Sequence, residues 1–224
     1  ERTMTMTTHN APTEMLADYA SGAVSPGLSL LLASHLTYSP ESRAEVALYE
    51  GVGGALLADE APAAMAATAL SDALAAIDAL GSETEMLSNG EEPASSRDIA
   101  TLPQPVRDLL DEEGVSLNWQ FRLPGVSEIV LPGFAGERVS LLRARPGSGI
   151  PQHTHEGVEL TLVLSGALED DGEVYRRGDL AVNTEDHDHR PRILDGETCI
   201  CLVVMTGQMR FTGRFSRALN YLAE

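Results

Sequence analysis

The spacing of apolar residues changes along the chain from a helical period to a strand period. Between residues 13 and 80 they recur at helical spacing, with Ser-Pro pairs at 25–26 and 39–40 that are typical of helix starts. Beyond a short helical piece around 106–110, apolar runs alternate with Gly, Pro and Asp turns, as in all-β sandwiches and barrels. We therefore predict an α+β, multidomain chain, in which a small bundle of about four helices is linked to a β-barrel with a separate core.

Four helices are expected in the first part. The first begins near Thr13 and ends at Gly22, the next two begin at the Ser-Pro pairs, and the fourth follows Pro62. The apolar positions of the second and fourth helices are Leu28, Leu31, Leu32, Leu36, Met65, Leu70, Leu74 and Ile77. We place the helical domain at residues 1–88, a flexible acidic linker at 89–98, and the β domain at 99–224.

The chain is strongly acidic, with a formal net charge of −19 over 224 residues. Because a DNA duplex is held chiefly by Lys and Arg, we expect no direct DNA binding. The charge suits a basic protein partner or only maintains solubility. No apolar run reaches the ~20 residues that span a bilayer, and the N-terminus shows no secretory pattern, so we expect a cytoplasmic protein without membrane contact.

The two cysteines, Cys199 and Cys201, lie two residues apart in the apolar run TCICLVVM. In a strand this spacing puts both side chains parallel on one face, which is a poor arrangement for a disulfide between them. We expect buried thiols. A role in oxidant sensing would require these thiols to be exposed and to have a low pKa.

The stretch HTHEGVELTLVLSG at 153–166 carries the ligands of a candidate metal site. His153 and His155 share one strand face, and Glu159 follows a short turn with matching parity, so all three can point into one barrel. The segment DHDHRP offers His187 or His189 as a fourth ligand. Imidazole and carboxylate are ligands that Zn, Fe, Mn and Ni all accept. The alternative is a set of surface or turn histidines.

The spacing of these residues resembles the two cupin motifs. Gly147, His153, His155, Glu159 and Gly166 match the first motif, and Gly178-Asp179 followed by a histidine resembles the second, without its usual Pro-x-Gly. The resemblance implies a small β-barrel that holds one metal by three His and one Glu. Carried over, the ligands are His153, His155, Glu159 and His189. His189 is preferred to His187 because its distance from Gly178 fits the second motif and Arg190-Pro191 follows it.

The helical part adds a wider resemblance. Together, ADYASGAVSPGLSLLLASHLTYSPESRAEVALYEGVGGALL, PQHTHEGVELTLVLSGAL and TCICLVV are similar to the ChrR family of anti-sigma factors over nearly the whole chain. The resemblance implies that the helical domain sequesters an extracytoplasmic-function sigma factor. It also implies that the cupin domain senses oxidative stress, either singlet oxygen or an organic peroxide, and triggers release. We expect zinc in the cupin, with Fe, Mn or Ni as alternatives.

One departure from the family pattern concerns the helical domain. Zinc-binding anti-sigma domains of this type carry His-x3-Cys-x2-Cys after an N-terminal His. His9 and His35 match the histidines, but Ser39 and Ser42 occupy the cysteine positions. Because hydroxyls are poor zinc ligands, we do not expect zinc there. Either the serines were introduced, or packing alone holds the bundle; Ser39 also suits a helix N-cap, and His35 a core position.

Two functions remain open at this point. The first is a regulator in which the helices bind a sigma factor and the cupin is structural or sensory, with no catalytic residues. The second is a cupin metalloenzyme, such as an iron or manganese dioxygenase or an isomerase, with an accessory helical domain; it requires an open coordination position and a pocket. An exposed sheet edge in the cupin could also pair with a second copy.

Overall fold

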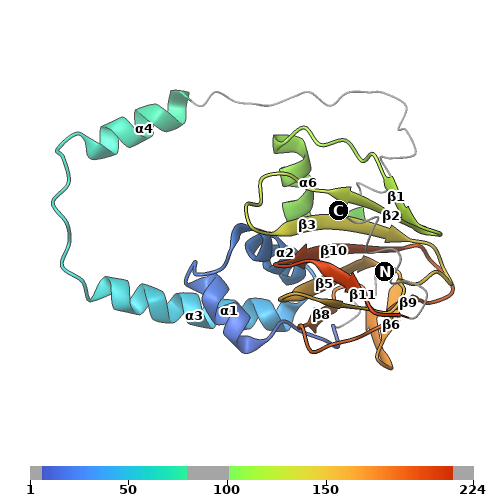
Figure 1. Cartoon of the computed structure of the whole chain (residues 1–224). Coiled ribbons are helices and arrows are strands. Elements are labelled where there is room, and N and C mark those ends of the chain that lie inside the picture. The colour runs from blue at the N-terminus through green and yellow to red at the C-terminus, as the bar shows by residue number, and fades with distance from the viewer. Residues whose placement is uncertain (1–6, 80–100, 214–224) are drawn as a thin grey trace, which may run out of the picture.

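The computed structural model describes residues 7–79 and 101–213 of the chain (Figure 1). The helices are α1 (Thr13–Ala20), α2 (Pro26–Leu36), α3 (Pro40–Ala58), α4 (Ala69–Ala79) and α6 (Gln104–Glu112). The strands are β1 (Gln120–Leu123), β2 (Val126–Val130), β3 (Arg138–Ala144), β4 (His153–His155), β5 (Glu159–Ser165), β6 (Ala167–Asp170), β7 (Glu173–Arg176), β8 (Leu180–Asn183), β9 (Arg192–Ile193), β10 (Cys199–Met205) and β11 (Met209–Phe211). The linker expected at 89–98 lies outside the described residues.

Serine caps begin α2 and α3, as the sequence predicts. The Ser25 side chain accepts a hydrogen bond from the backbone N–H of Leu28, and Ser39 accepts one from Ser42. The first helix differs from expectation, because its N-cap is Pro12 and it ends at Ala20. The fourth helix begins only at Ala69, so Met65 lies before it.

The strands form an antiparallel barrel-like domain. Its largest sheet has the order β1-β2-β3-β10-β5-β8, and smaller sheets have the orders β7-β6-β9 and β11-β4. Every residue of the central strand β10 is buried. Alternate residues of this strand therefore face two apolar regions: Leu202 packs into the core that includes the helices, while Cys201 packs into the barrel interior.

The helices and the sheet share one hydrophobic core, so the expectation of two separate cores was wrong. Leu31 and Leu32 of α2 are fully buried in the same apolar cluster as Leu162 of β5 and Leu202 of β10. Burial of one such leucine side chain is worth about 1.5–3 kcal/mol. The apolar stripe of α2 was identified correctly from the sequence, but the sequence did not show that the sheet covers it.

The far half of α3 and all of α4 lie away from this core (Figure 1). Residues 50–60 are exposed, and α4 contains no buried residue. Among the described helices of the N-terminal part, only α1, α2 and the first half of α3 therefore pack together, in place of the predicted four-helix bundle. No helix within residues 7–79 and 101–213 is long and apolar enough to cross a membrane.

Candidate functional site

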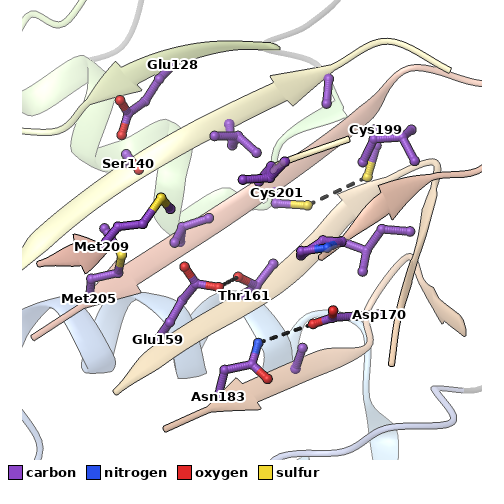
Figure 2. A pocket seen from close by; sticks show the side chains of 18 residues that line it. Glu128, Ser140, Glu159, Thr161, Asp170, Asn183, Cys199, Cys201, Met205 and Met209 are labelled. Carbon is purple, nitrogen blue, oxygen red and sulfur yellow. Dashed lines mark hydrogen bonds between the residues drawn. The ribbon is translucent and has the colours of Figure 1, made fainter. Parts of the chain in front are cut away.

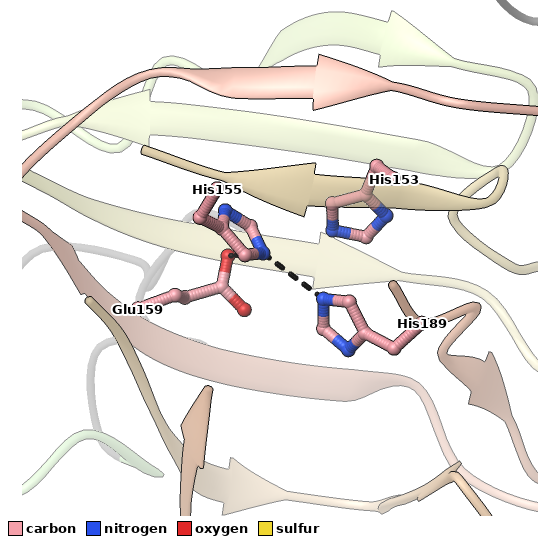
Figure 3. A group of neighbouring side chains, drawn as sticks. All are labelled: His153, His155, Glu159 and His189. Atoms are coloured by element: carbon pink, nitrogen blue, oxygen red, sulfur yellow. Dashed lines mark hydrogen bonds and ion pairs between the residues drawn. The ribbon is translucent and has the colours of Figure 1, made fainter. Parts of the chain in front are cut away.

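Four buried side chains that carry metal-binding atoms meet inside the barrel (Figure 3). His153 and His155 lie on β4, Glu159 begins β5, and His189 pairs with His153 across an isolated bridge. One nitrogen or oxygen atom from each side chain lies within 4.8 Å of those of the others. The alternating geometry of β4 directs both of its histidines to the same side. The structure thus brings together the four residues expected from the sequence.

Hydrogen bonds orient two of the imidazoles. The Nδ1–H of His153 donates to the carbonyl of Pro151 at 2.8 Å, and Nδ1 of His189 lies 2.6 Å from a carboxylate oxygen of Asp170. Both rings therefore turn Nε2 toward the cluster, as metal-binding histidines do. The buried Nε2 of His153 has no hydrogen-bond partner within the part of the chain that the structure describes.

The other two members complete the cluster. Nε2 of His155 lies 3.0 Å from Nε2 of His189 and 3.5 Å from a carboxylate oxygen of Glu159. Thr161 donates a hydrogen bond of 3.3 Å to the other oxygen of Glu159. Three imidazole nitrogens and one carboxylate, with a buried nitrogen left unpaired, fit a divalent cation such as Zn, Fe, Mn or Ni. A cation there would act as a Lewis acid or as a structural centre, held by these four side chains.

The pKa shifts of His153 and His155 favour the neutral imidazoles that bind a metal ion near neutral pH. Burial and the neighbouring His189 lower the pKa of His153 to about 4. Burial and the other two histidines lower the pKa of His155 to about 3. Burial raises the pKa of Glu159 to about 6. For His189, burial acts to lower the pKa, but the hydrogen bond and charge of Asp170 outweigh it and raise the pKa.

His187, the other candidate ligand, lies outside the cluster. It is exposed, and its Nδ1 accepts a hydrogen bond of 2.9 Å from the backbone N–H of Thr184. Asp170, in contrast, orients His189 and was missed by sequence reasoning. The run EDDGE around it looks like an ordinary polar turn, because nothing local reveals that Asp170 faces a histidine from a distant segment.

A cavity in the barrel interior adjoins the cluster (Figure 2). Its lining includes Glu159, Asp170, Met205, Cys199 and Cys201. The two thiols are free and buried, as predicted, with their sulfur atoms 3.6 Å apart. The hydrogen bond with Cys199 and burial raise the pKa of Cys201 well above its ordinary value. Neither requirement for a reactive thiolate, exposure or a low pKa, is met by Cys201.

Three positions of the family zinc pattern, His35, Ser39 and Ser42, belong to a hydrogen-bonded network. The Ser39 hydroxyl donates to Asn10 Oδ1 at 2.8 Å, and Thr7 donates to the same oxygen at 2.5 Å. Ser39 and Ser42 hydroxyls are 3.0 Å apart, and Ser42 Oγ is 3.0 Å from Nε2 of His35. All three of these family positions are buried. Hydroxyls that are already paired in this way do not fit a zinc ion.

His9 does not join this network. Its ring stacks on Tyr175 with centroids 4.4 Å apart, and its nitrogens lie 3.5 Å from Glu173 and 3.7 Å from Asp179. His35, in contrast, is fully buried, and its pKa is lowered by burial. The histidine positions of the family pattern therefore face different partners, and the expectation of no zinc in the helical part stays a prediction.

Known proteins resemble this chain along most of its length. A family profile described as the ChrR cupin-like domain matches residues 114–210. The anti-sigma-E factor ChrR of Cereibacter sphaeroides is 31% identical over 205 residues, covering 91% of this chain and 92% of that protein. A chain in the crystal structure of Rhodobacter sphaeroides SigE in complex with the anti-sigma ChrR aligns with a TM-score of 0.72 and 30% identity, covering 90% of this chain and 100% of that chain.

The family profile covers only the barrel, but the alignments with the two relatives cover about nine-tenths of this chain and therefore include the helical part. The aligned fold also has the same combination of helices and cupin-like sheets. Both the resemblance and the α+β fold expected from the sequence are confirmed. This chain belongs to the ChrR family of anti-sigma factors.

Proposed function

We propose that this protein is an anti-sigma factor that binds an extracytoplasmic-function sigma factor through α3 and α4. The single observation that carries the proposal is an apolar surface on these helices that the rest of the described chain leaves uncovered. Leu48, Val52 and Leu56 recur every four residues on α3, and all are more than half exposed. The related structure, a complex with SigE, supports a sigma factor as the partner.

The second apolar stripe lies on α4. Leu70, Leu74 and Ile77 are spaced to share one face, with exposed fractions of 72%, 53% and 63%. Contiguous exposed apolar surface of this kind marks a protein–protein interaction site. The net charge of −19 also favours a partner with basic surfaces, because opposite charges steer association.

Co-purification of the full chain with the sigma factor encoded beside its gene tests this function. The double substitution Val52→Glu with Leu56→Glu places two charges in the proposed interface and is expected to abolish the complex. Phe121→Glu is the matched control, because Phe121 is 73% exposed on β1, outside the proposed surface. Equal binding by both variants would refute this interface, and no binding by the unaltered chain would refute the function.

For the cupin, we propose that His153, His155, Glu159 and His189 bind one divalent metal ion, with zinc preferred. Support comes from the four converging donor atoms, which a closed tetrahedral zinc site would use in full. Elemental analysis of the full chain is expected to give about one equivalent of metal per chain. His189→Ala should lose it, whereas His187→Ala, in the exposed neighbour, should retain it.

We further propose that the cupin senses singlet oxygen or an organic peroxide and releases the sigma factor. The cavity beside the metal cluster gives a small oxidant a place next to the ligands. The pKa of Cys201 argues for a signal that acts at the metal centre and not at a pre-formed thiolate. His153→Ala is expected to retain sigma binding but to lose release by a photosensitiser or peroxide; normal release would contradict this role.

The alternative of a cupin metalloenzyme is less well supported, because the relative that matches nearly the whole chain is named as an anti-sigma factor. A protein that sequesters a sigma factor acts beside RNA polymerase, which is consistent with the cytoplasmic location predicted from the sequence. The absence of direct DNA binding and a homo-oligomer formed through the cupin both stay predictions.

A further inference from the structure

The N-terminal segment and the helices meet the cupin at a polar turn, residues 177–179, between β7 and β8. Asp179 is buried, and its Oδ1 accepts hydrogen bonds from the backbone N–H groups of Thr8 at 2.6 Å and His9 at 3.0 Å. Its Oδ2 accepts the N–H of Arg176 within the turn at 2.8 Å. Hydrogen bonds to a charged acceptor are among the stronger ones in proteins, so Asp179 binds the segment firmly to the cupin.

His35 makes a second connection to the same turn. Its Nδ1–H donates to the carbonyl of Gly178 at 2.9 Å, while Nε2 accepts the backbone N–H of Ala11 at 3.3 Å and lies 3.0 Å from Ser42 Oγ. One fully buried imidazole therefore joins the N-terminal segment, α2, the start of α3 and the cupin. Beside it, the guanidinium of Arg177 lies 4.9 Å from the centre of the Tyr38 ring.

A separate contact holds the other end of α2. The hydroxyl of Ser25 donates to Glu137 Oε1 at 2.5 Å, and the backbone N–H of Gly27 donates to Oε2 at 2.9 Å. A carboxylate at a helix N-terminus satisfies free N–H groups and interacts favourably with the helix dipole. A Cβ at Gly27 would lie 2.7 Å from Glu137 and Val139, so glycine permits this close approach.

We propose that Thr8, His9, His35, Gly178 and Asp179 form a latch that makes the N-terminal helices depend on the cupin for their order. In the family pattern the corresponding helical positions would fasten the helices to one another through zinc. Here the hydrogen bonds fasten them to the β7–β8 turn. The latch and the shared core beneath it act together, because undocking would break these bonds and expose Leu31 and Leu32.

The latch has a consequence for regulation that rests on the proposed function. α3 begins directly after Ser39, whose hydroxyl belongs to the network around His35, and the exposed apolar stripe lies farther along the same helix. On the cupin side, Asp179 immediately precedes β8. Asn183 of β8 donates to Asp170, which holds the proposed ligand His189. The latch thus lies between the two proposed binding sites.

Gly178→Ala in the full chain tests the latch directly. The added Cβ would lie 2.7 Å from Thr7 and 2.8 Å from Tyr38, so it should push the helices away from the turn. Gly172→Ala is the matched control, because Gly172 also has a positive φ, of 85° against 93°, but its Cβ would meet nothing within 4 Å. Both variants strain the backbone; only the first disturbs the latch.

The readout is amide hydrogen exchange of the full chain without sigma factor. We expect exchange at residues 8–11 and 31–36 to be roughly 10- to 100-fold faster in Gly178→Ala than in Gly172→Ala, with little difference in β2. Equal exchange in the two variants would overturn the latch. A sigma-binding assay is separate, so loss of binding with unchanged exchange would count against the latch without rejecting the anti-sigma function.

A second pair covers the case in which Gly178→Ala does not fold. Asp179→Asn removes the charge that accepts the N–H groups of Thr8 and His9, while Asp171→Asn removes an exposed charge in the turn between β6 and β7. Faster exchange at residues 8–11 in Asp179→Asn alone supports the latch. The same exchange in both variants overturns it.

Discussion

The buried histidines of the cupin and the buried His35 of the helical part have opposite chemistry. In the cupin, His153, His155, Glu159 and His189 converge, and the buried Nε2 of His153 has no hydrogen-bond partner among the described residues. In the helical part, both ring nitrogens of His35 already have partners. A buried polar atom without a partner costs free energy that a cation can recover, whereas a satisfied network gains nothing from one. At His153 and His35, the completeness of the hydrogen bonding around the buried ring, and not the presence of histidine, distinguishes the candidate metal site from the hydrogen-bonded network.

The largest expected effect concerns metal content. The full chain should bind one equivalent of zinc, His153→Ala should bind none, and His35→Gln should still bind one. Since ligand binding stabilises the folded state, chelation should lower the free energy of unfolding by about 4 kcal/mol if zinc had been present at about 1,000 times its Kd. Elemental analysis and urea unfolding check both quantities. Two equivalents of zinc in the unaltered chain, or one equivalent that is lost in His35→Gln, would show that the helical part also binds metal.

Asp170→Asn tests whether the cupin cluster is oriented as a metal site. Loss of the carboxylate that holds Nδ1 of His189 should weaken metal binding roughly 10- to 100-fold while leaving all four ligands in place. Competition with a chromophoric chelator measures this affinity. Asp171→Asn, at the next residue of the same turn, is the control and should bind metal normally. Unchanged affinity in Asp170→Asn would show that the hydrogen bond does not position His189.

Ser39→Ala tests the network in the helical part. The buried hydroxyl caps α3 and donates to Asn10, so its removal should lower the free energy of unfolding by about 1–2 kcal/mol without changing metal content. Denaturant unfolding of the full chain measures the change. Ser71→Ala, at an exposed serine of α4, should change stability by less than about 0.5 kcal/mol. A loss of bound metal in Ser39→Ala would contradict the assignment of this network.

The pH dependence of stability gives the smallest effect. Burial lowers the pKa of His35 in the folded chain, so the unfolded chain binds more protons as the pH falls below about 6.5. The stabilisation that neutral His35 provides is therefore complete above that pH and is lost as the pH falls toward the lowered pKa. Urea unfolding of metal-free chains should show a stability difference between the unaltered chain and His35→Gln that shrinks below about pH 6.5. A difference that grows on acidification would contradict a buried neutral imidazole.

The two regions also show which features of the fold and of the candidate site can be predicted from the sequence. The Ser-Pro helix starts and the parity of His153, His155 and Glu159 depend on neighbours within a few residues, and the structure reproduces both. The choice of His189 over His187 came from motif spacing, and only His189 joins the cluster. The first helix boundary was misplaced because Pro12, which fixes φ, serves as the N-cap in place of Thr13.

The sequence by itself determined the α+β division, the two helix starts at Ser-Pro pairs, the burial of the two thiols and the four residues of the candidate metal cluster. Each follows from local periodicity or from motif spacing. Only the tertiary structure decided that the helices share a core with the sheet, that His35 contacts Gly178, and that Asp170 holds His189. Residues 35 and 178 are 143 positions apart, and no local pattern records which distant groups will satisfy a buried polar atom.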